Sequence, residues 1–220
     1  MGIWNLLSDP RGFLLQALYS LPAILIALSF HEWGHSYAAY RLGDPTARNL
    51  GRMTVNPFRH IDPLGFAMLL LVGFGWAKPV PINPRNFKNL RRDEIVVSLA
   101  GITMNLILAL IGMLIFYVYV IAGGGNEVIL RMLSYFLSIN LGLMIFNLIP
   151  IPPLDGSHVL ESLLIRHTGP KPFVFLERYG NLILLALLLT GVVSTILGNA
   201  VSYIIDGMRL LFNAIFGVSF

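Results

Sequence analysis

The 220-residue chain contains no cysteine and few charged residues. The absence of cysteine excludes disulfide bonds, zinc sites built from cysteine, and catalysis by a thiol. Charged residues make up only 12% of the chain, whereas apolar residues make up 56%. In a soluble domain about a quarter of the residues are charged. The composition therefore predicts a polytopic membrane protein, and the length leaves no room for a large soluble domain beside it.

Apolar segments recur along the chain and predict the membrane helices. We expect the first helix at residues 21–40, with Ser20 as its N-cap and Gly43 after its end. Further apolar segments lie at 95–122, 128–149, 173–197 and 200–217. The run at 64–76 is short for a hydrocarbon core about 30 Å thick, so we expect it to be re-entrant or interfacial. The pattern predicts an all-α polytopic membrane protein with a bundle of about five to six membrane helices.

The basic residues predict an orientation. Nine of the 15 Lys and Arg residues lie between Arg41 and Arg92, and basic loops stay on the cytoplasmic side. If 64–76 does not cross, the whole of 41–92 is cytoplasmic and the later helices alternate in direction. Residues 149–156 then reach the same membrane half as the end of the first helix. We expect a multi-pass protein of the cell membrane whose polar site opens towards the cytoplasm.

The stretch FHEWGH places three ionisable side chains in the first apolar segment. His31 and His35 are four residues apart, so on a helix they share one face and both imidazoles can bind one metal ion. Glu32 points to the side and can act as general base on a water in the site. The alternative is a pair of buried histidines bonded to backbone carbonyls, with Glu32 paired to Arg41.

Two histidines leave a zinc ion without a third protein ligand. Asp155 is the best candidate, because the prolines before it break the helix and a broken helix is tolerated where it lines a cavity. Alternatively, Asp155 only caps a helix that starts at Gly156. The other residues considered were His60, Asp62, His158 and Glu161. We expect His60 to bond Asp62 or the loop backbone, and His158 and Glu161 to lie on the helix after residue 155.

Five stretches together carry a resemblance: FHEWGH, GRMTVNPFRHIDPLG, GWAKPVPINPRNF, AGITMN and NLIPIPPLDG. They resemble the site-2 protease family of intramembrane zinc metalloproteases, peptidase family M50, and in particular its short bacterial and archaeal branch without a PDZ or CBS domain. The match covers residues 20–165 of a single domain, 1–220, whose C-terminal membrane helices we expect at 172–217. The resemblance implies that His31, His35 and Asp155 bind one zinc ion and that Glu32 is the catalytic base.

The resemblance also implies substrate contacts. The family's G-x-x-x-N element falls on Gly101 and Asn105, and Asn147 begins its N-x-x-P-x-x-P-L-D-G element. Either asparagine can stabilise an oxyanion or hold the substrate backbone; the alternative is hydrogen bonding between helices. In the family, the region matching RNLGRMTVNP forms a re-entrant β-hairpin. A substrate strand would then pair at Gly51, Met53 and Val55, whereas the alternative is a cytoplasmic loop.

These features predict a zinc-dependent intramembrane endopeptidase acting on single-span membrane proteins in the lipid bilayer, as in regulated intramembrane proteolysis. We expect no nucleic-acid partner. A metal transporter would want acidic or histidine residues on several helices, and 95–122 and 128–149 contain none. An inactive scaffold would not need Glu32. A membrane protease of another HExxH family would be revealed by a third ligand other than Asp155. The sequence leaves the substrate and the oligomeric state open.

Overall fold

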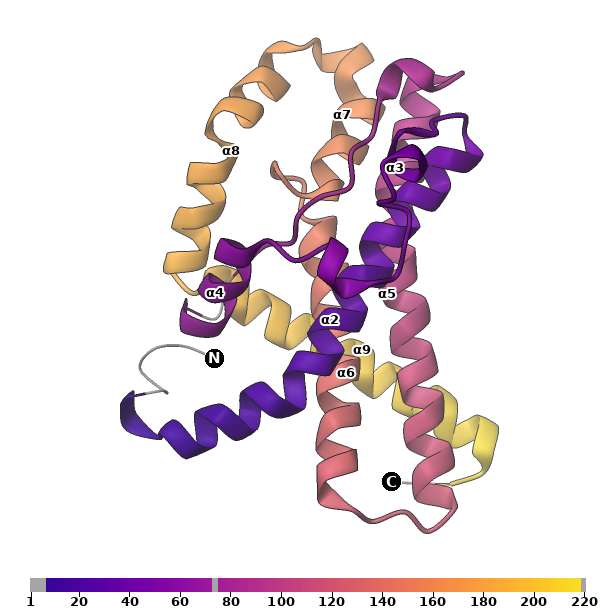
Figure 1. The fold of residues 1–220 in the computed structure, drawn as a ribbon, viewed down its shortest axis with the longest axis vertical. Coiled ribbons are helices and arrows are strands. Elements are labelled where there is room, and N and C mark those ends of the chain that lie inside the picture. Colours follow the sequence, from indigo (N-terminus) through magenta and orange to yellow (C-terminus); the bar gives the residue numbers. More distant parts are fainter. Residues whose placement is uncertain (1–6, 73–74, 219–220) are drawn as a thin grey trace.

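The computed structural model describes residues 7–72 and 75–218, which form helices joined by loops (Figure 1). The long helices are α2 (Pro10–Arg41), α5 (Leu90–Ile121), α6 (Glu127–Leu148), α8 (Lys171–Leu189) and α9 (Val192–Phe216). The shorter ones are α3 (Thr46–Asn49), α4 (Pro63–Val72), α7 (Asp155–Thr168) and the 3-10 helices η1 (Pro57–Arg59) and η2 (Pro84–Asn86). The described residues contain no β-strand, only an isolated antiparallel bridge between Ile61 and Ala77. The all-α class is confirmed.

Four helices in the described ranges are long and apolar enough to cross a membrane: α2, α5, α6 and α8. They confirm the membrane class but are fewer than the five to six helices expected. Helix α4 has 10 residues, or about 15 Å, which is half the thickness of the hydrocarbon core. That length agrees with a segment that does not cross. Helix α9 has 25 residues but carries Asp206 and Arg209, and it is not among the four.

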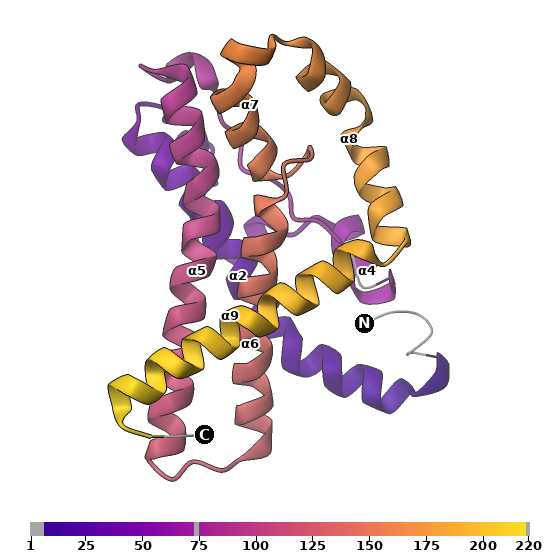
Figure 2. The same cartoon turned by 180° about the vertical axis from the view of Figure 1, so that it is seen from behind.

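Helices α2, α5 and α6 form the centre of the bundle (Figure 1). Figure 2 shows α9 running obliquely across α5 and α6, where it covers the back of the bundle. The Phe212 ring of α9 packs against Tyr117 of α5, with ring centroids 5.3 Å apart. The buried core shared by these helices consists of Ile102, Ala109, Met113, Tyr117, Leu137, Leu141, Met144, Met208 and Phe212.

Helix α2 starts earlier than the sequence predicted. Its N-cap is Asp9, whose carboxylate accepts a 2.9 Å hydrogen bond from the amide of Gly12. Ser20, the expected cap, lies inside the helix and donates to the carbonyl of Ala17. Pro22 also lies inside the helix, where proline removes one backbone hydrogen bond and bends the axis. Figure 1 shows the result, an oblique N-terminal limb followed by a limb that rises beside α5.

The breaks between the later helices set the direction of the chain. Helix α6 ends at Leu148, and residues 149–154 are non-helical before α7 begins at Asp155, as the prolines predict. The last two helices are divided at Gly191 rather than at 197–200, because Gly191 has φ of 73°, a left-handed conformation that favours glycine. In Figure 1 the connections after α2, before α5 and between α7 and α8 lie at one end, and the α5–α6 connection lies at the other.

Candidate metal centre

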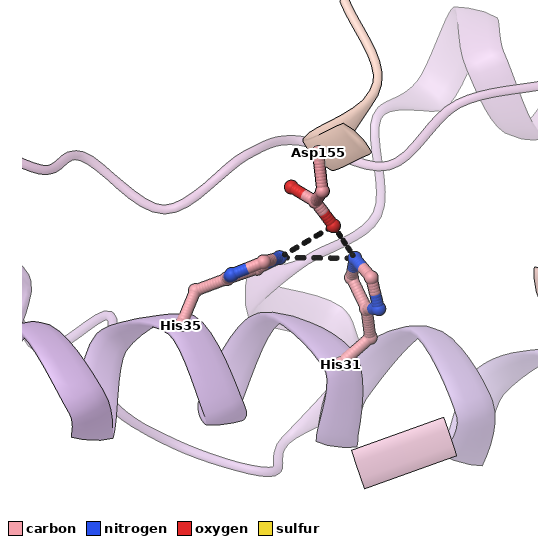
Figure 3. Close-up of side chains that lie close together, drawn as sticks. All are labelled: His31, His35 and Asp155. Carbon is pink, nitrogen blue, oxygen red and sulfur yellow. Dashed lines mark hydrogen bonds and ion pairs between the residues drawn. The ribbon is translucent and has the colours of Figure 1, made fainter. Parts of the chain in front are cut away.

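Three side chains from two distant segments converge at the centre of the molecule. His31 and His35 lie one turn apart on α2, and Asp155 is the first residue of α7 (Figure 3). The two Nε2 atoms are 3.0 Å apart. The Oδ2 atom of Asp155 lies 3.2 Å from Nε2 of His31 and 3.3 Å from Nε2 of His35. The three atoms therefore form a compact triangle that faces a common point.

The dimensions of this triangle fit one zinc ion. Zinc binds nitrogen and oxygen ligands tetrahedrally at about 2.0–2.2 Å, which places neighbouring ligand atoms about 3.3–3.6 Å apart. The observed separations of 3.0–3.3 Å are within a few tenths of an ångström of that range. Oδ2 of Asp155 is buried and accepts no hydrogen bond, as expected of an atom that binds a cation. Two imidazoles and one carboxylate also match the protein ligands of catalytic zinc sites.

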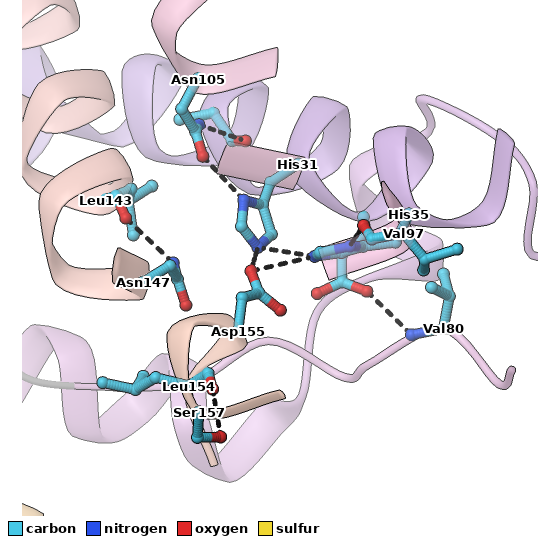
Figure 4. Close-up of polar contacts among 12 residues, drawn as sticks. His31, His35, Val80, Val97, Asn105, Leu143, Asn147, Leu154, Asp155 and Ser157 are labelled. Carbon is cyan, nitrogen blue, oxygen red and sulfur yellow. Dashed lines mark hydrogen bonds and ion pairs between the residues drawn. The ribbon is translucent and has the colours of Figure 1, made fainter. Parts of the chain in front are cut away.

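Hydrogen bonds on the far side of each imidazole fix its tautomer (Figure 4). Nδ1 of His35 lies 2.8 Å from the carbonyl of Val97, and Nδ1 of His31 lies 2.7 Å from Oδ1 of Asn105. Because carbonyl oxygens only accept, both Nδ1 atoms carry the hydrogen. Each Nε2 then keeps its lone pair, which is the state that binds a metal.

Asn105 is held in turn by a second asparagine that the sequence analysis did not identify. The side-chain amide of Asn105 donates to the carbonyl of Ala27 and to Oδ1 of Asn140, at 3.2 Å each. Asn140 donates to the carbonyl of Phe136, and both asparagines are completely buried. Asn105 thus has no hydrogen left for a substrate oxyanion and instead joins helices, as the alternative interpretation proposed. An amide inside the apolar run 128–149 was the available signal for Asn140.

Gly101 explains how the imidazoles fit against α5. A Cβ atom at this position would lie 2.4 Å from Nε2 of His35 and 2.8 Å from Cε1 of His31. Any side chain here would push both rings away from their ligand positions. On α2, a Cβ at Gly34 would meet the carbonyl oxygen of Ala100 at 2.9 Å. The two glycines together allow α2 and α5 to approach closely at the metal centre.

The local structure around Asp155 argues against a role in capping alone. The N-cap of α7 is Leu154, and no side-chain hydrogen bond caps this helix. A Cβ at Gly156 would lie 2.4 Å from the carbonyl oxygen of Leu148. Glycine therefore lets α7 begin directly against the end of α6, and that close start points Asp155 towards α2 (Figure 3).

The carboxylate of Glu32 is buried beside the two histidines. Its Oε2 atom accepts a 2.8 Å hydrogen bond from the amide of Val80. The guanidinium group of Arg52 donates to the carbonyls of Lys78 and Pro79, at 2.8 and 3.2 Å, and so fixes the residues before Val80. Arg52 and Val80 lie in two of the stretches that carry the resemblance, but sequence reasoning gave neither residue a role.

A cavity of about 520 Å³ borders the metal centre. Its walls come from α2, from the extended segment 75–82, and from the end of α6 and the start of α7. Asn147 lines this cavity, and its side-chain amide donates to the carbonyl of Leu143 at 3.0 Å. An amide nitrogen carries two hydrogens, so Asn147 keeps one for another acceptor. The catalytic cavity, as we call it, therefore has a donor close to Asp155 (Figure 4).

Comparison with known proteins gives the family. The profile described as Peptidase family M50 matches residues 124–191. A relative from Bacillus subtilis (strain 168), named "Putative zinc metalloprotease YwhC", is 38% identical over 205 residues, which are 90% of this chain and 92% of the relative. This chain belongs to peptidase family M50.

Two proteins named "Putative zinc metalloprotease Rip2" are also similar. The one from Mycolicibacterium smegmatis is 30% identical over 171 residues, 64% of its length. The one from Mycobacterium tuberculosis (strain H37Rv) is 33% identical over 146 residues, 55% of its length.

No solved structure matches the chain. Family membership confirms the site-2 protease resemblance. His31, His35 and Asp155 form a group that could bind one metal ion. The protein is therefore a zinc metalloprotease.

The other ligand candidates of this M50 peptidase have different partners. Nε2 of His60 donates to the carbonyl of Thr54 at 2.7 Å, which confirms the expected bond to the loop backbone. Asp62 accepts from the amide of Gly65 at the start of α4. His158 and Glu161 lie on α7, as expected, and His158 lines the catalytic cavity. In the described part of the chain, the group of His31, His35 and Asp155 is the one whose ligand atoms converge.

The expected β-hairpin is not confirmed. Residues 50–56 form turns and irregular backbone between α3 and η1. Gly51, Met53 and Val55 do not line the catalytic cavity, whereas most of the extended segment 75–82 does. The three residues that the resemblance assigned to substrate pairing therefore lie outside this cavity, and the segment that lines it comes later in the chain.

Proposed function

We propose that this zinc metalloprotease cleaves the transmembrane segments of single-span membrane proteins within the lipid bilayer. The observation that carries the proposal is the position of His31 and His35. Both lie in α2, a helix whose length and composition suit a membrane span, and yet they border a cavity of about 520 Å³. Ionisable residues inside such a helix cost free energy, so their presence there indicates a function. A catalytic centre at this position favours substrates that arrive through the bilayer.

Glu32 is the proposed general base. Val80 holds one of its oxygens, and the carboxylate is placed to take a proton from a water in the site and to deliver it to the nitrogen of the leaving amine. Zinc bound by the three ligands supplies Lewis acidity that acidifies this water and polarises the peptide carbonyl. The second amide hydrogen of Asn147 is the proposed donor to the developing oxyanion.

A helical substrate must unwind before its backbone can reach these groups. The extended segment 75–82 runs along the catalytic cavity, and the amide of Lys78 is held from behind by the carbonyl of His60 at 2.8 Å. We propose that an unwound substrate pairs by strand addition with the start of this segment, at residues 75–77. In this proposal it takes the place first assigned to Gly51, Met53 and Val55.

The test uses the full chain in liposomes, loaded with zinc and mixed with a panel of single-span proteins. Mass spectrometry identifies the cut bonds for wild type and for Glu32→Gln. The proposal expects wild type to cut inside the apolar segment of at least one protein, and the variant to bind zinc without cutting. Cuts found only in soluble loops, or a Glu32→Gln variant that cuts normally, would contradict it.

A second part of the proposal concerns orientation. We propose that the protein lies in the cell membrane with the site opening towards the cytoplasm, as the basic residues of 41–92 favour. Single cysteines introduced at Arg48, Lys88 and His167 should react only with reagents that reach the cytoplasm. A cysteine at Gly124 should react from the opposite side. Labelling of Arg48 and Lys88 positions from opposite sides would contradict the re-entrant assignment of 64–76.

A further inference from the structure

A second cavity, of about 330 Å³, lies between α2, α4 and α6. Most of its wall is apolar, and the side chains that dominate it are Ile24, Leu25, Leu28, Phe66, Leu69 and Leu143. Among the polar residues at its edge, Asp62 accepts from the amide of Gly65 and Ser20 donates to the carbonyl of Ala17, whereas Nδ1 of His60 is buried without a partner. The mainly apolar wall suits an apolar group.

This apolar cavity adjoins the catalytic cavity. The two cavities share five lining residues, namely Leu28, Gly75, Trp76, Ala77 and Leu143. A chain that lies along the extended segment 75–82 can therefore keep its backbone at the metal centre and place a side chain across this shared wall. The continuity identifies the occupant as part of the molecule being cut.

The apolar cavity, with a volume of about 330 Å³, has room for a large side chain. We propose that the apolar cavity is a specificity pocket for one large aliphatic or aromatic side chain of the unwound substrate. This inference rests on the proposed function and adds which residues near the cut bond are preferred.

The distance along α2 gives the position of that side chain. Leu28 and Ile24 precede His31 by three and seven residues, or about 5 and 10 Å along the helix axis. An extended peptide advances about 3.3 Å per residue. The side chain in the pocket therefore belongs to a residue about two to three positions from the cut bond.

Gly142 offers a way to fill the pocket. It lies inside α6 and lines the apolar cavity, and a Cβ atom built there meets no atom within 4 Å. A larger side chain can thus extend into the pocket without displacing its neighbours. Gly207, inside α9, also has open space around its Cβ position and lines neither cavity. It provides a matched control for a change from glycine to leucine in a helix.

The experiment measures kcat/KM for a cleavable single-span substrate whose residues on either side of the cut bond are changed in turn to Ala, Leu or Phe. At one position, two to three residues from the bond, wild type should prefer Leu or Phe over Ala by on the order of tenfold. Gly142→Leu should abolish or reverse this preference while zinc content stays unchanged. Gly207→Leu should keep the preference of wild type.

A second variant keeps the pocket testable if Gly142→Leu does not fold. Phe66→Ala enlarges the pocket, so it should raise the rate for a Trp-bearing substrate relative to the Leu-bearing one at the same position. Wild type that cuts without any size preference, or variants that leave the preference unchanged, would overturn the pocket and leave the proposed function intact. Wild type that cuts no substrate at all would overturn the proposed function itself.

Discussion

Two acidic side chains in this protein have opposite surroundings. Asp44, after the end of α2, accepts hydrogen bonds from the amide and hydroxyl of Thr46, from the amide of Asn83 at 2.8 Å, and from the side chain of Asn86 at 2.7 Å. Asp155 has a buried Oδ2 atom that accepts none, although two imidazole nitrogens lie within 3.3 Å of it. Both are acidic residues close to the ends of helices, so the sequence makes them look alike.

The difference separates a structural carboxylate from a ligand. A buried charge is stable when hydrogen-bond donors surround it, and Asp44 has four such contacts. Two of them, from Asn83 and Asn86, tie the end of α2 to the loop before α5. Asp155 faces the lone pairs of His31 and His35 instead. Three acceptors pointing at one another are stable only when a cation lies between them.

The largest effect is expected for Glu32→Gln in the zinc-loaded protein. Cleavage should fall by about 10²–10⁴-fold, because glutamine cannot take the proton that a general base must remove. Zinc content, measured by atomic emission, should remain that of wild type, since no ligand is altered. Glu177→Gln makes the same chemical change at an exposed position of α8 and serves as control. Equal rates for the two variants would remove Glu32 from the chemistry.

Asp155→Asn should lower zinc affinity more than about 100-fold, beyond the effect expected for residues that only support a ligand. Asparagine keeps the shape but replaces an anionic oxygen donor with a weaker one. Competition with a chelating dye gives the affinity, and His35→Ala serves as the metal-free reference. Normal zinc occupancy and turnover would direct the search for a third ligand to Asp62 or Glu161.

Asn140→Leu should lower zinc affinity by about 10–100-fold, although Asn140 does not touch the metal group. Leucine lacks the side-chain carbonyl of Asn140 that accepts a hydrogen bond from Asn105, so Asn105 becomes free to rotate. His31 then loses the acceptor that fixes its tautomer. Asn199→Leu, an equal change on the exposed face of α9, is the control. Unchanged zinc affinity in Asn140→Leu would show that Asn105 keeps its orientation without this support.

The smallest effect is expected for Asp44→Asn, which should cost about 1–3 kcal/mol of stability at neutral pH and leave zinc affinity unchanged. Burial alone would raise the pKa of Asp44, but the hydrogen bonds from Thr46, Asn83 and Asn86 outweigh it and lower that pKa. The stabilisation is therefore present above the unfolded pKa of about 3.9 and lost as the pH falls through the lower folded value. Unfolding measured at pH 7 and at pH 3 should show the two proteins converging at the lower pH.

Much of the site follows from the sequence because its information is local. A period of 3.6 residues places His31 and His35 on one face of a helix whatever surrounds it. The prolines after Leu148 end α6 by removing backbone donors, and the scarcity of charge predicts a membrane protein. These features depend on neighbouring residues alone. The N-cap of α2 was wrongly predicted because Ser20 and Asp9 carry equivalent capping signals.

The tertiary structure decided the partners that lie far apart in the chain. Asn140 and Arg52 act through bonds across 35 and 26 residues, and no local pattern distinguishes them from other buried amides or surface cations. Only the tertiary structure explains Gly101, because two imidazoles occupy the space that a Cβ atom would fill there. The sequence determined which groups can bind zinc, because ligand chemistry belongs to each residue. Only the packing of α2 against α5 and α6, and of α7 against α5, decided which of them meet, because hydrogen bonds and close contacts between distant segments depend on how the helices assemble.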